Sequence, residues 1–584
     1  MRTCACMIIF LLLLSCSEQP ADNQDRTTRL NDIFDEIDHF DDSPEDSLYR
    51  GKHPLQPWSS VADTAQRRRA GRIQKFIDEL QSIEESSLSE QESISRRVMI
   101  FRLQNQVDRV SSNMHLIPFN AEGGFYNSMS FVLSNLPFKT TDDYRLYLAW
   151  LPEYNKRLQE NLALLRLGVE KKVVAPAIVV KNTLQLLEPW RKPWSESVYY
   201  RPFNSLPDNT PETDRQYLLE QAKLQVSAIQ QTYDSIYAFF EGDYMASANE
   251  EPGISLVPGG KAYYANRVRH YTTLDITPDS VHQLGLSEVT RIRQSMDSII
   301  QALNYKGSYA QFLNFLRTDA QFYPTTPQEL LNRAAWLSKK AEGQLPRLFK
   351  KLYSLPFTVE PVPDHIAPTY TTGRYVGGSW DTQRAGIYWV NTYNLPSRTL
   401  YTLPALTLHE AVPGHHLQNA LVAELDSLPS FRNNFYISAF GEGWGLYSEY
   451  LGEEMGMYET PYELFGRYTY EMWRACRLVV DTGMHDKGWS RQQALDYMAS
   501  NTALSLHEVT TEIDRYIGWP GQALSYKIGE IKIKALREHA SRSLGDRFDV
   551  REFHHVVLRN GSIPLDILED QVNAYIMEAT EKNL

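Results

Sequence analysis

The chain has 584 residues, which is enough for two or three domains or for one large helical body. Its 59 basic and 72 acidic residues give a net charge of -13 without any basic run, so nucleic acid and other polyanions are not expected as partners. Of its four cysteines only Cys476 lies beyond residue 16, so no disulfide between folded segments is expected.

The N-terminus has the pattern of a bacterial lipoprotein signal. A positive start precedes a short apolar run over 7–14, and Ser15 stands directly before Cys16. The run is too short to cross roughly 30 Å of hydrocarbon as a helix, which favours a signal peptide over a membrane span. We predict a signal peptide over 1–15, a flexible tether over 16–27, and a lipid on Cys16 that anchors the exported protein to a periplasm-facing or cell-surface membrane. An ordinary cleaved signal with an incidental cysteine is the alternative.

Apolar residues at three- and four-residue spacing dominate most of the chain and predict helices. The Pro- and Gly-rich stretch 251–260 is the best boundary, so we expect a helical N-terminal half over 28–255 and a catalytic half over 256–584. The predicted helices cover 29–40, 65–80, 90–110, 142–167, 211–240, 278–303, 401–425, 435–454, 462–484, 491–501, 505–517 and 520–543.

The pattern changes between residues 357 and 391. The segments 357–363 and 386–391 are short, rich in β-branched and aromatic residues, and flanked by Gly or Pro, which predicts strands. The second segment, which ends at Asn391, offers backbone groups that could pair with an extended substrate. We therefore predict a mainly α fold with one small β element before the helix that carries the chemical motif.

The strongest chemical signal is LHEAVPGHHLQ, residues 408–418. In a regular zinc-binding helix two histidines four residues apart lie on one face, about 6 Å apart along the axis, so one metal can bind both. His409 begins such a pattern, but Pro413 occupies the position of the second histidine. Pro413 and Gly414 break a regular helix, and two looped-out residues would bring His415 to the usual position. A helix end with clustered surface histidines is the alternative.

The choice between His415 and His416 as second ligand depends on that break. On an unbroken helix His416 returns to the face of His409, but it lies roughly 10.5 Å along the axis, which zinc–nitrogen bonds of about 2 Å do not span. We therefore predict that His415 binds the metal and that His416 faces the cleft or a carboxylate. Glu410, next to the first ligand, is the predicted base that takes a proton from the attacking water.

The segment FGEGWGLYSEY begins 25 residues after His415 and carries two glutamates seven residues apart, Glu442 and Glu449. Their spacing places them on one helical face. A carboxylate on a helix that follows two histidines completes the His/His/Glu set of gluzincins, with a fourth position open for water. We predict that Glu442, flanked by glycines that allow close approach, is the third ligand. Glu449 is either a hydrogen-bond partner of a ligand histidine or a solvated carboxylate.

Four blocks together, HEAVPGHHLQ, FGEGWGLYSE, RACRLVVDTGMH and RYIGWPGQALSYKIG, resemble the bacterial domain-of-unknown-function family 885. More distantly they resemble thermostable carboxypeptidases, thimet oligopeptidase and angiotensin-converting enzyme. The resemblance covers most of the mature chain and implies a helical, zincin-like metallopeptidase body with a deep cleft, Zn²⁺ as cofactor and short peptides as substrates. Glu442 and Glu449 match the E-x6-E spacing of those peptidases, and Gly414-His415 matches their Gly-His. The two-residue insertion is a departure.

Hydrolysis of a peptide also needs donors for the developing oxyanion and groups that hold the substrate. Arg474 and Arg477 suit either a substrate carboxylate or helix ion pairs. Two other readings remain open: a degenerate peptidase that binds peptides without cutting them, and a lipoprotein that acts as a structural or uptake partner at the cell surface. The predicted donors are Tyr526 and His485, and the predicted substrate-binding residues are Asn391, Tyr516, Lys527 and Arg477.

Overall fold

The computed structural model describes residues 21–41, 59–127, 133, 136, 138–364, 366–425 and 428–581. The predicted signal peptide and Cys16 lie outside these residues. The first described helix starts at Ala21, so it includes the end of the segment that we expected to be a flexible tether. None of the helices in these ranges is long and apolar enough to cross a membrane.

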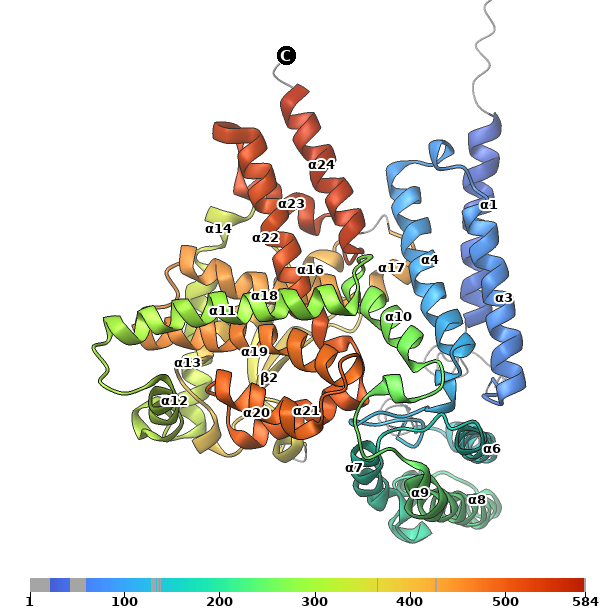
Figure 1. Ribbon diagram of the computed structural model, residues 1–584. Coiled ribbons are helices and arrows are strands. Elements are labelled where there is room, and N and C mark those ends of the chain that lie inside the picture. Colours follow the sequence, from blue (N-terminus) through green and yellow to red (C-terminus); the bar gives the residue numbers. More distant parts are fainter. Residues whose placement is uncertain are drawn as a thin grey trace, which may run out of the picture.

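The helices before residue 250 gather on one side of the molecule, where α1, α3 and α4 pack side by side and α6 to α9 lie below them in the view of Figure 1. The division into halves near residue 255 stays a prediction. These helices are α1 (Ala21–Asp41), α3 (Asp63–Gln81), α4 (Glu90–Ser111), α6 (Thr141–Glu170), α7 (Ala177–Leu187), α8 (Glu212–Phe239) and α9 (Met245–Ser247).

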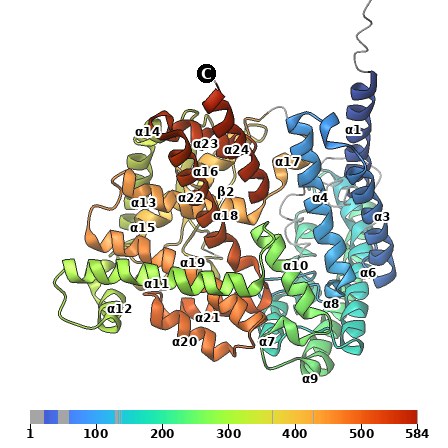
Figure 2. The same cartoon turned by 45° about the horizontal axis from the view of Figure 1, so that its top comes forward.

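The remaining helices form the larger body, in which α11 lies along α19 in Figures 1 and 2. They begin with α10 (Gly260–Thr272), α11 (Pro278–Ala302), α12 (Tyr309–Thr318), α13 (Pro327–Glu342) and α14 (Leu345–Leu348). After a sheet follow α15 (Leu403–Glu410), α16 (His415–Val422), α17 (Ser430–Asn434), α18 (Ser438–Glu454), α19 (Pro461–His485), α20 (Arg491–Asn501), α21 (Leu506–Gly518), α22 (Ser525–Leu544), α23 (Val550–Leu558) and α24 (Leu565–Glu581).

The small β element is a three-stranded sheet between α14 and α15. Strand β3 (Gly386–Val390) is central; it pairs in parallel with β1 (Phe357–Pro361) and antiparallel with β2 (Gly373–Val376). The mainly α fold with a small sheet before the motif helix is therefore confirmed. Because both sides of β3 are occupied, it cannot accept a substrate strand as we expected, whereas β2 forms an edge of the sheet.

Two glycines allow α18 and α22 to touch through their backbones. A Cβ atom on Gly443 of α18 would lie 2.5 Å from the Cα of Gly529 on α22. A Cβ on Gly529 would lie 2.0 Å from the carbonyl oxygen of Ala439. Contacts this short leave no space for a methyl group, so only glycine permits this crossing.

Candidate metal centre

The helix that carries His409 is interrupted before His415. α15 ends at Glu410 and α16 begins at His415. The N–H of Gly414 donates to the carbonyl of Leu408 at 2.9 Å, six residues back instead of the usual four, so two residues are looped out. A Cβ on Gly414 would lie 1.9 Å from the carbonyl oxygen of His409, which makes glycine necessary here. The predicted break at Pro413-Gly414 is present.

The structure brings three of the predicted ligands together. Nε2 of His409 lies 3.5 Å and Nε2 of His415 lies 3.4 Å from the same oxygen, Oε2 of Glu442. One ligand atom from each of the three residues lies within 4.8 Å of the others. Two donors about 2.1 Å from a tetrahedral zinc ion are roughly 3.4 Å apart, so the group fits a metal of this kind.

The charges around this group favour a cation. Burial opposes protonation of His409, but Glu442 and Glu449 outweigh it and raise the pKa of His409 to about 9. Burial also opposes ionisation of Glu442, yet His409 and His415 hold the pKa of this carboxyl well below its usual value. Without a metal, His409 therefore carries a proton at neutral pH, and a metal ion would displace it.

Glu449 fixes the orientation of His409 from the other side. Its Oε1 accepts the Nδ1–H of His409 at 2.8 Å, and its side chain is fully buried. A Cβ on Gly445 would lie 2.7 Å from Nε2 of His409, so the absence of a side chain there lets the imidazole lie against α18. We had expected the glycines beside Glu442 to serve this purpose, but Gly441 and Gly443 instead make room for Tyr436 and Gly529.

His416 does not take part in the group. Its ring packs 4.5 Å from the rings of Tyr353 and Phe357, and burial lowers its pKa to about 4. Its Nδ1 contacts the hydroxyl of Tyr375 at 3.1 Å. The expectation that His416 faces the cleft or a carboxylate was wrong, because the helix break turns its side chain into an aromatic pocket beside β1.

Glu410 lies next to the three ligands and is held by the edge strand. Its Oε2 accepts the backbone N–H of Tyr375, in β2, at 2.8 Å. The side chain is nearly buried, and its charge acts on His409. This contact orients the carboxylate without neutralising it, as a proton acceptor beside the metal requires.

Two tyrosines lie at the group. The Tyr526 ring stacks 6.4 Å from that of His409, and burial followed by the charge of Glu442 raises the pKa of the Tyr526 hydroxyl, which keeps it a donor. Tyr436 donates its hydroxyl to Oε1 of Glu442 at 3.0 Å and is 47% exposed. Sequence reasoning missed Tyr436, because it precedes α18 and belongs to no chemical pattern.

His485 and Asn391 are structural, contrary to our prediction. His485 accepts the N–H of Ile254 on Nδ1 and donates from Nε2 to the carbonyl of Tyr516, so both ring nitrogens are occupied. Burial lowers its pKa to about 4. The amide of Asn391 donates to the carbonyls of Ala367, Tyr370 and Thr371, which braces the loop before β2.

Tyr516 and Arg477 also have internal partners. The hydroxyl of Tyr516 donates to Glu512 at 2.6 Å and accepts from Nε of Arg477 at 2.7 Å. Nη2 of Arg477 also donates to Glu512 at 3.0 Å, and the Arg477 guanidinium lies 4.4 Å from the centre of the Tyr526 ring. Arg477 thus supports the ring of Tyr526, and the prediction that Tyr516 and Arg477 bind substrate directly gains no support from these contacts.

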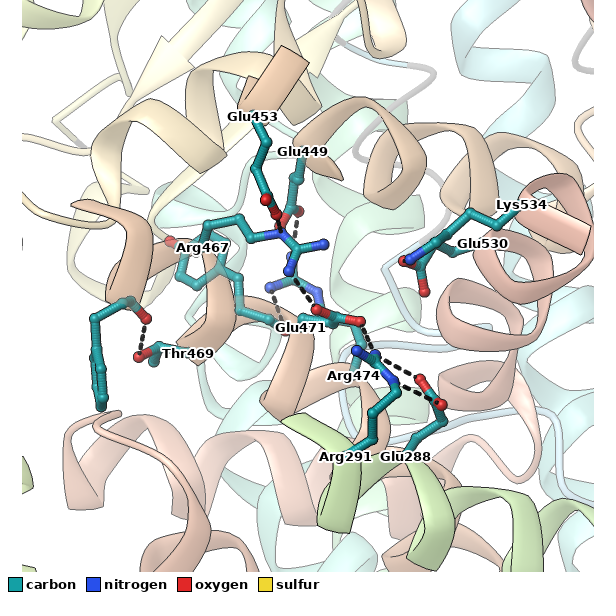
Figure 3. A network of polar contacts seen from close by, with 12 residues as sticks. Glu288, Arg291, Glu449, Glu453, Arg467, Thr469, Glu471, Arg474, Glu530 and Lys534 are labelled. Carbon is teal, nitrogen blue, oxygen red and sulfur yellow. Dashed lines mark hydrogen bonds and ion pairs between the residues drawn. The ribbon is translucent and has the colours of Figure 1, made fainter. Parts of the chain in front are cut away.

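Lys527 belongs to a buried ion cluster that joins α11, α19 and α22. Its ammonium, fully buried, lies 2.7 Å from Glu471 and 3.0 Å from Glu288, and it also pairs with Glu530. Arg467 binds Glu471 from within α19 at 2.6 Å. Figure 3 shows the three carboxylates and Arg467 among the helices that carry the candidate site. The prediction that Lys527 binds substrate is therefore wrong.

Removing Lys527 is expected to destabilise the whole fold. In Lys527→Met two fully buried carboxylates lose a counter-charge, which costs about 3 to 5 kcal/mol in free energy of unfolding. Urea denaturation measures this loss. Lys532→Met on the same helix is the control, because the Lys532–Glu569 pair is partly exposed and contributes about 1 kcal/mol or less. Equal losses in the two variants would contradict the assigned role.

The comparisons with known proteins agree with the sequence blocks. The profile of the family described as "Bacterial protein of unknown function (DUF885)" matches residues 44–572. The chain belongs to this family. The predicted membership is thus confirmed, and the DUF885 profile covers all the residues of the candidate metal centre. No curated protein matches the sequence.

Two solved structures share the fold of this chain. A protein from Colwellia psychrerythraea, described as a candidate lipoprotein, is 27% identical with a TM-score of 0.83, and the match covers 95% of this chain and 99% of that one. A candidate lipoprotein of unknown function from Shewanella oneidensis is 16% identical, with a TM-score of 0.75 over 93% and 99% of the two chains. An M32 carboxypeptidase from Deinococcus radiodurans R1 is 12% identical with a TM-score of only 0.36 over 95% and 99%, too low to support a conclusion.

Proposed function

We propose that the protein is a zinc-dependent peptidase that hydrolyses short peptides. The observation that carries this proposal is the convergence of His409, His415 and Glu442 beside Glu410, whose carboxylate is oriented by the backbone N–H of Tyr375. His415 and Glu442 remain 12% and 15% exposed, so the group can be reached from solvent. Zn²⁺ held by these three residues would polarise the peptide carbonyl and activate water.

We assign proton transfer, stabilisation of the oxyanion and peptide binding to other residues near the metal ligands. Glu410 accepts the proton of the attacking water and passes it to the leaving amine. The hydroxyls of Tyr526 and Tyr436, whose side chains lie at the metal ligands, would donate to the negative charge that develops on the carbonyl oxygen. The edge strand β2, whose Tyr375 already orients Glu410, offers backbone groups to an extended peptide.

Metal analysis of the purified protein combined with a mass-spectrometric survey of a mixed peptide library tests this function. One zinc per chain and cleavage that stops on chelation are the expected results. Zinc without cleavage of any peptide would instead indicate a protein that binds peptides without cutting them. A chain that binds no metal and is recovered with a protein partner would indicate a structural or uptake role.

We also propose that the protein is exported and anchored by a lipid on Cys16, in keeping with the signal pattern and with the descriptions of the two similar structures. Cys16→Ser is expected to abolish incorporation of labelled fatty acid and to release the protein from the membrane fraction, because a single acylated cysteine supplies the whole anchor. Cys476→Ser, a buried thiol, is the control that should stay on the membrane. Unchanged membrane attachment of Cys16→Ser would contradict the anchor.

A further inference from the structure

The carboxylate of Glu449 is fully buried and only partly satisfied. One oxygen, Oε1, accepts the Nδ1–H of His409 at 2.8 Å. The other, Oε2, has no hydrogen-bond partner among the described residues. A buried carboxylate with an unsatisfied oxygen is costly unless a positive charge faces it. A permanently charged neighbour would therefore stabilise this carboxylate whatever the protonation state of His409.

Arg474 supplies that charge. Its side chain is 6% exposed, and its Nη2 lies 3.7 Å from Oε1 of Glu449. In the described part of the chain it forms no other ion pair; its one hydrogen bond is a long contact of 3.4 Å to the carbonyl of Tyr470, and Nε has no partner. The rings of Trp473 and Tyr470 cover the guanidinium at 4.3 and 4.6 Å, which keeps water away from it. Figure 3 shows Arg474 reaching from α19 toward Glu449 on α18.

The neighbouring arginines of α19 differ from Arg474 in this respect. Arg467 is bound to Glu471 at 2.6 Å, and Arg477 is bound to Glu512 at 3.0 Å. Among the described residues, neither Glu471 nor Glu512 contacts a predicted metal ligand. Arg474, which lies between these two arginines, is thus the one that is directed at the partner of His409.

We propose that Arg474 is a positioning residue of the metal centre, which acts on His409 through Glu449. Its charge holds the Glu449 carboxylate against Nδ1, and the imidazole is then fixed with Nε2 toward Glu442 and His415. The inference rests on the proposed zinc function, because it concerns how well His409 binds the ion. Loss of an outer partner of a ligand histidine costs about 10- to 100-fold in metal affinity, and the 3.7 Å contact places Arg474 near the lower limit.

A double-mutant cycle tests the route through Glu449. The zinc affinity of the full chain, measured by competition with a chelator, is expected to fall about 10-fold in Arg474→Met. In a Glu449→Gln background the same substitution should change it little, because the carboxylate that Arg474 faces is gone. The absorption spectrum of the Co²⁺-loaded protein should shift in Arg474→Met and not between Glu449→Gln and the double variant. Arg317→Met, a half-buried arginine that caps carbonyls near residue 502, should leave zinc affinity unchanged.

Arg474→Met removes the cation that faces Glu449 and can fail to fold, but the comparison of Glu449→Gln with the double variant does not depend on it, since neither of these two carries the Glu449 charge. Equal zinc affinity in these two variants is expected; a further 10-fold loss in the double variant would overturn the inference. Unchanged affinity in a folded Arg474→Met would overturn it as well, while normal zinc binding by the unmodified chain would leave the proposed function standing. An unmodified chain that binds no zinc would overturn both.

Discussion

Glu410→Gln is expected to lose about 10²- to 10⁴-fold in turnover while it keeps its metal, as the removal of a general base predicts. The amide oxygen of a glutamine can still accept the N–H of Tyr375, so the loop around β2 should stay in place. What the variant lacks is the negative charge that takes the proton from water. Single-turnover rates on a cleaved peptide measure the loss of the base, and the zinc content shows whether the metal is retained.

The matched control is Glu538→Gln, an exposed glutamate on α22 whose nearest cation is Arg542 at 3.6 Å. It should retain the rate of the unmodified protein. Near-normal turnover of Glu410→Gln would remove Glu410 from the mechanism. A simultaneous loss of zinc would show instead that Glu410 contributes to the metal site.

His415→Ala is expected to lose stoichiometric zinc and all turnover, whereas His416→Ala should retain both. His415 shares an oxygen of Glu442 with His409, and no nearby histidine can replace it, since His416 points into the pocket of Tyr353 and Phe357. The loss of zinc affinity in His415→Ala should exceed the factor of about 10 to 100 that follows removal of a hydrogen-bond partner of a ligand. Zinc content after dialysis and titration with a competing chelator give the measurement.

The effect of His416→Ala should appear in stability instead. The substitution leaves a cavity between aromatic rings, and large-to-small changes in a packed core cost about 2 to 5 kcal/mol. A His416→Ala variant that folds but has lost its zinc would show that His416, and not His415, binds the ion.

Much of the fold follows from periodicity. The predicted helices over 278–303 and 435–454 correspond to α11 and α18 and lie within a few residues of their ends. Among the helices of more than five residues, those that the prediction missed are α7, α10, α12, α13, α23 and α24. In α10 the buried face includes Arg267 and Tyr264 and therefore lacks an apolar pattern. Strand β2 was missed because it has four residues, one of them the exposed Arg374.

The site was predictable where it depends on chain-local geometry. The helix break follows from Pro413 and Gly414. The seven-residue spacing of Glu442 and Glu449 predicts that both lie on the helical face that contacts His409. The wrong choices, His485 and Lys527, are polar residues whose partners come from distant helices. A titratable residue in a motif looks the same in sequence whether it meets solvent, substrate or a buried carboxylate, so only tertiary contacts decide its role.

The crossing of α18 and α22 at Gly443 and Gly529 has a consequence for the variability of the protein. α18 carries Glu442 and α22 carries Tyr526, so the gap between ligand and donor is set where the two backbones touch. A displacement of about 1 Å between reacting groups can cost about 10²-fold in rate. Under the proposed mechanism, evolutionary constraint therefore extends to two glycines that contact neither the ion nor the peptide.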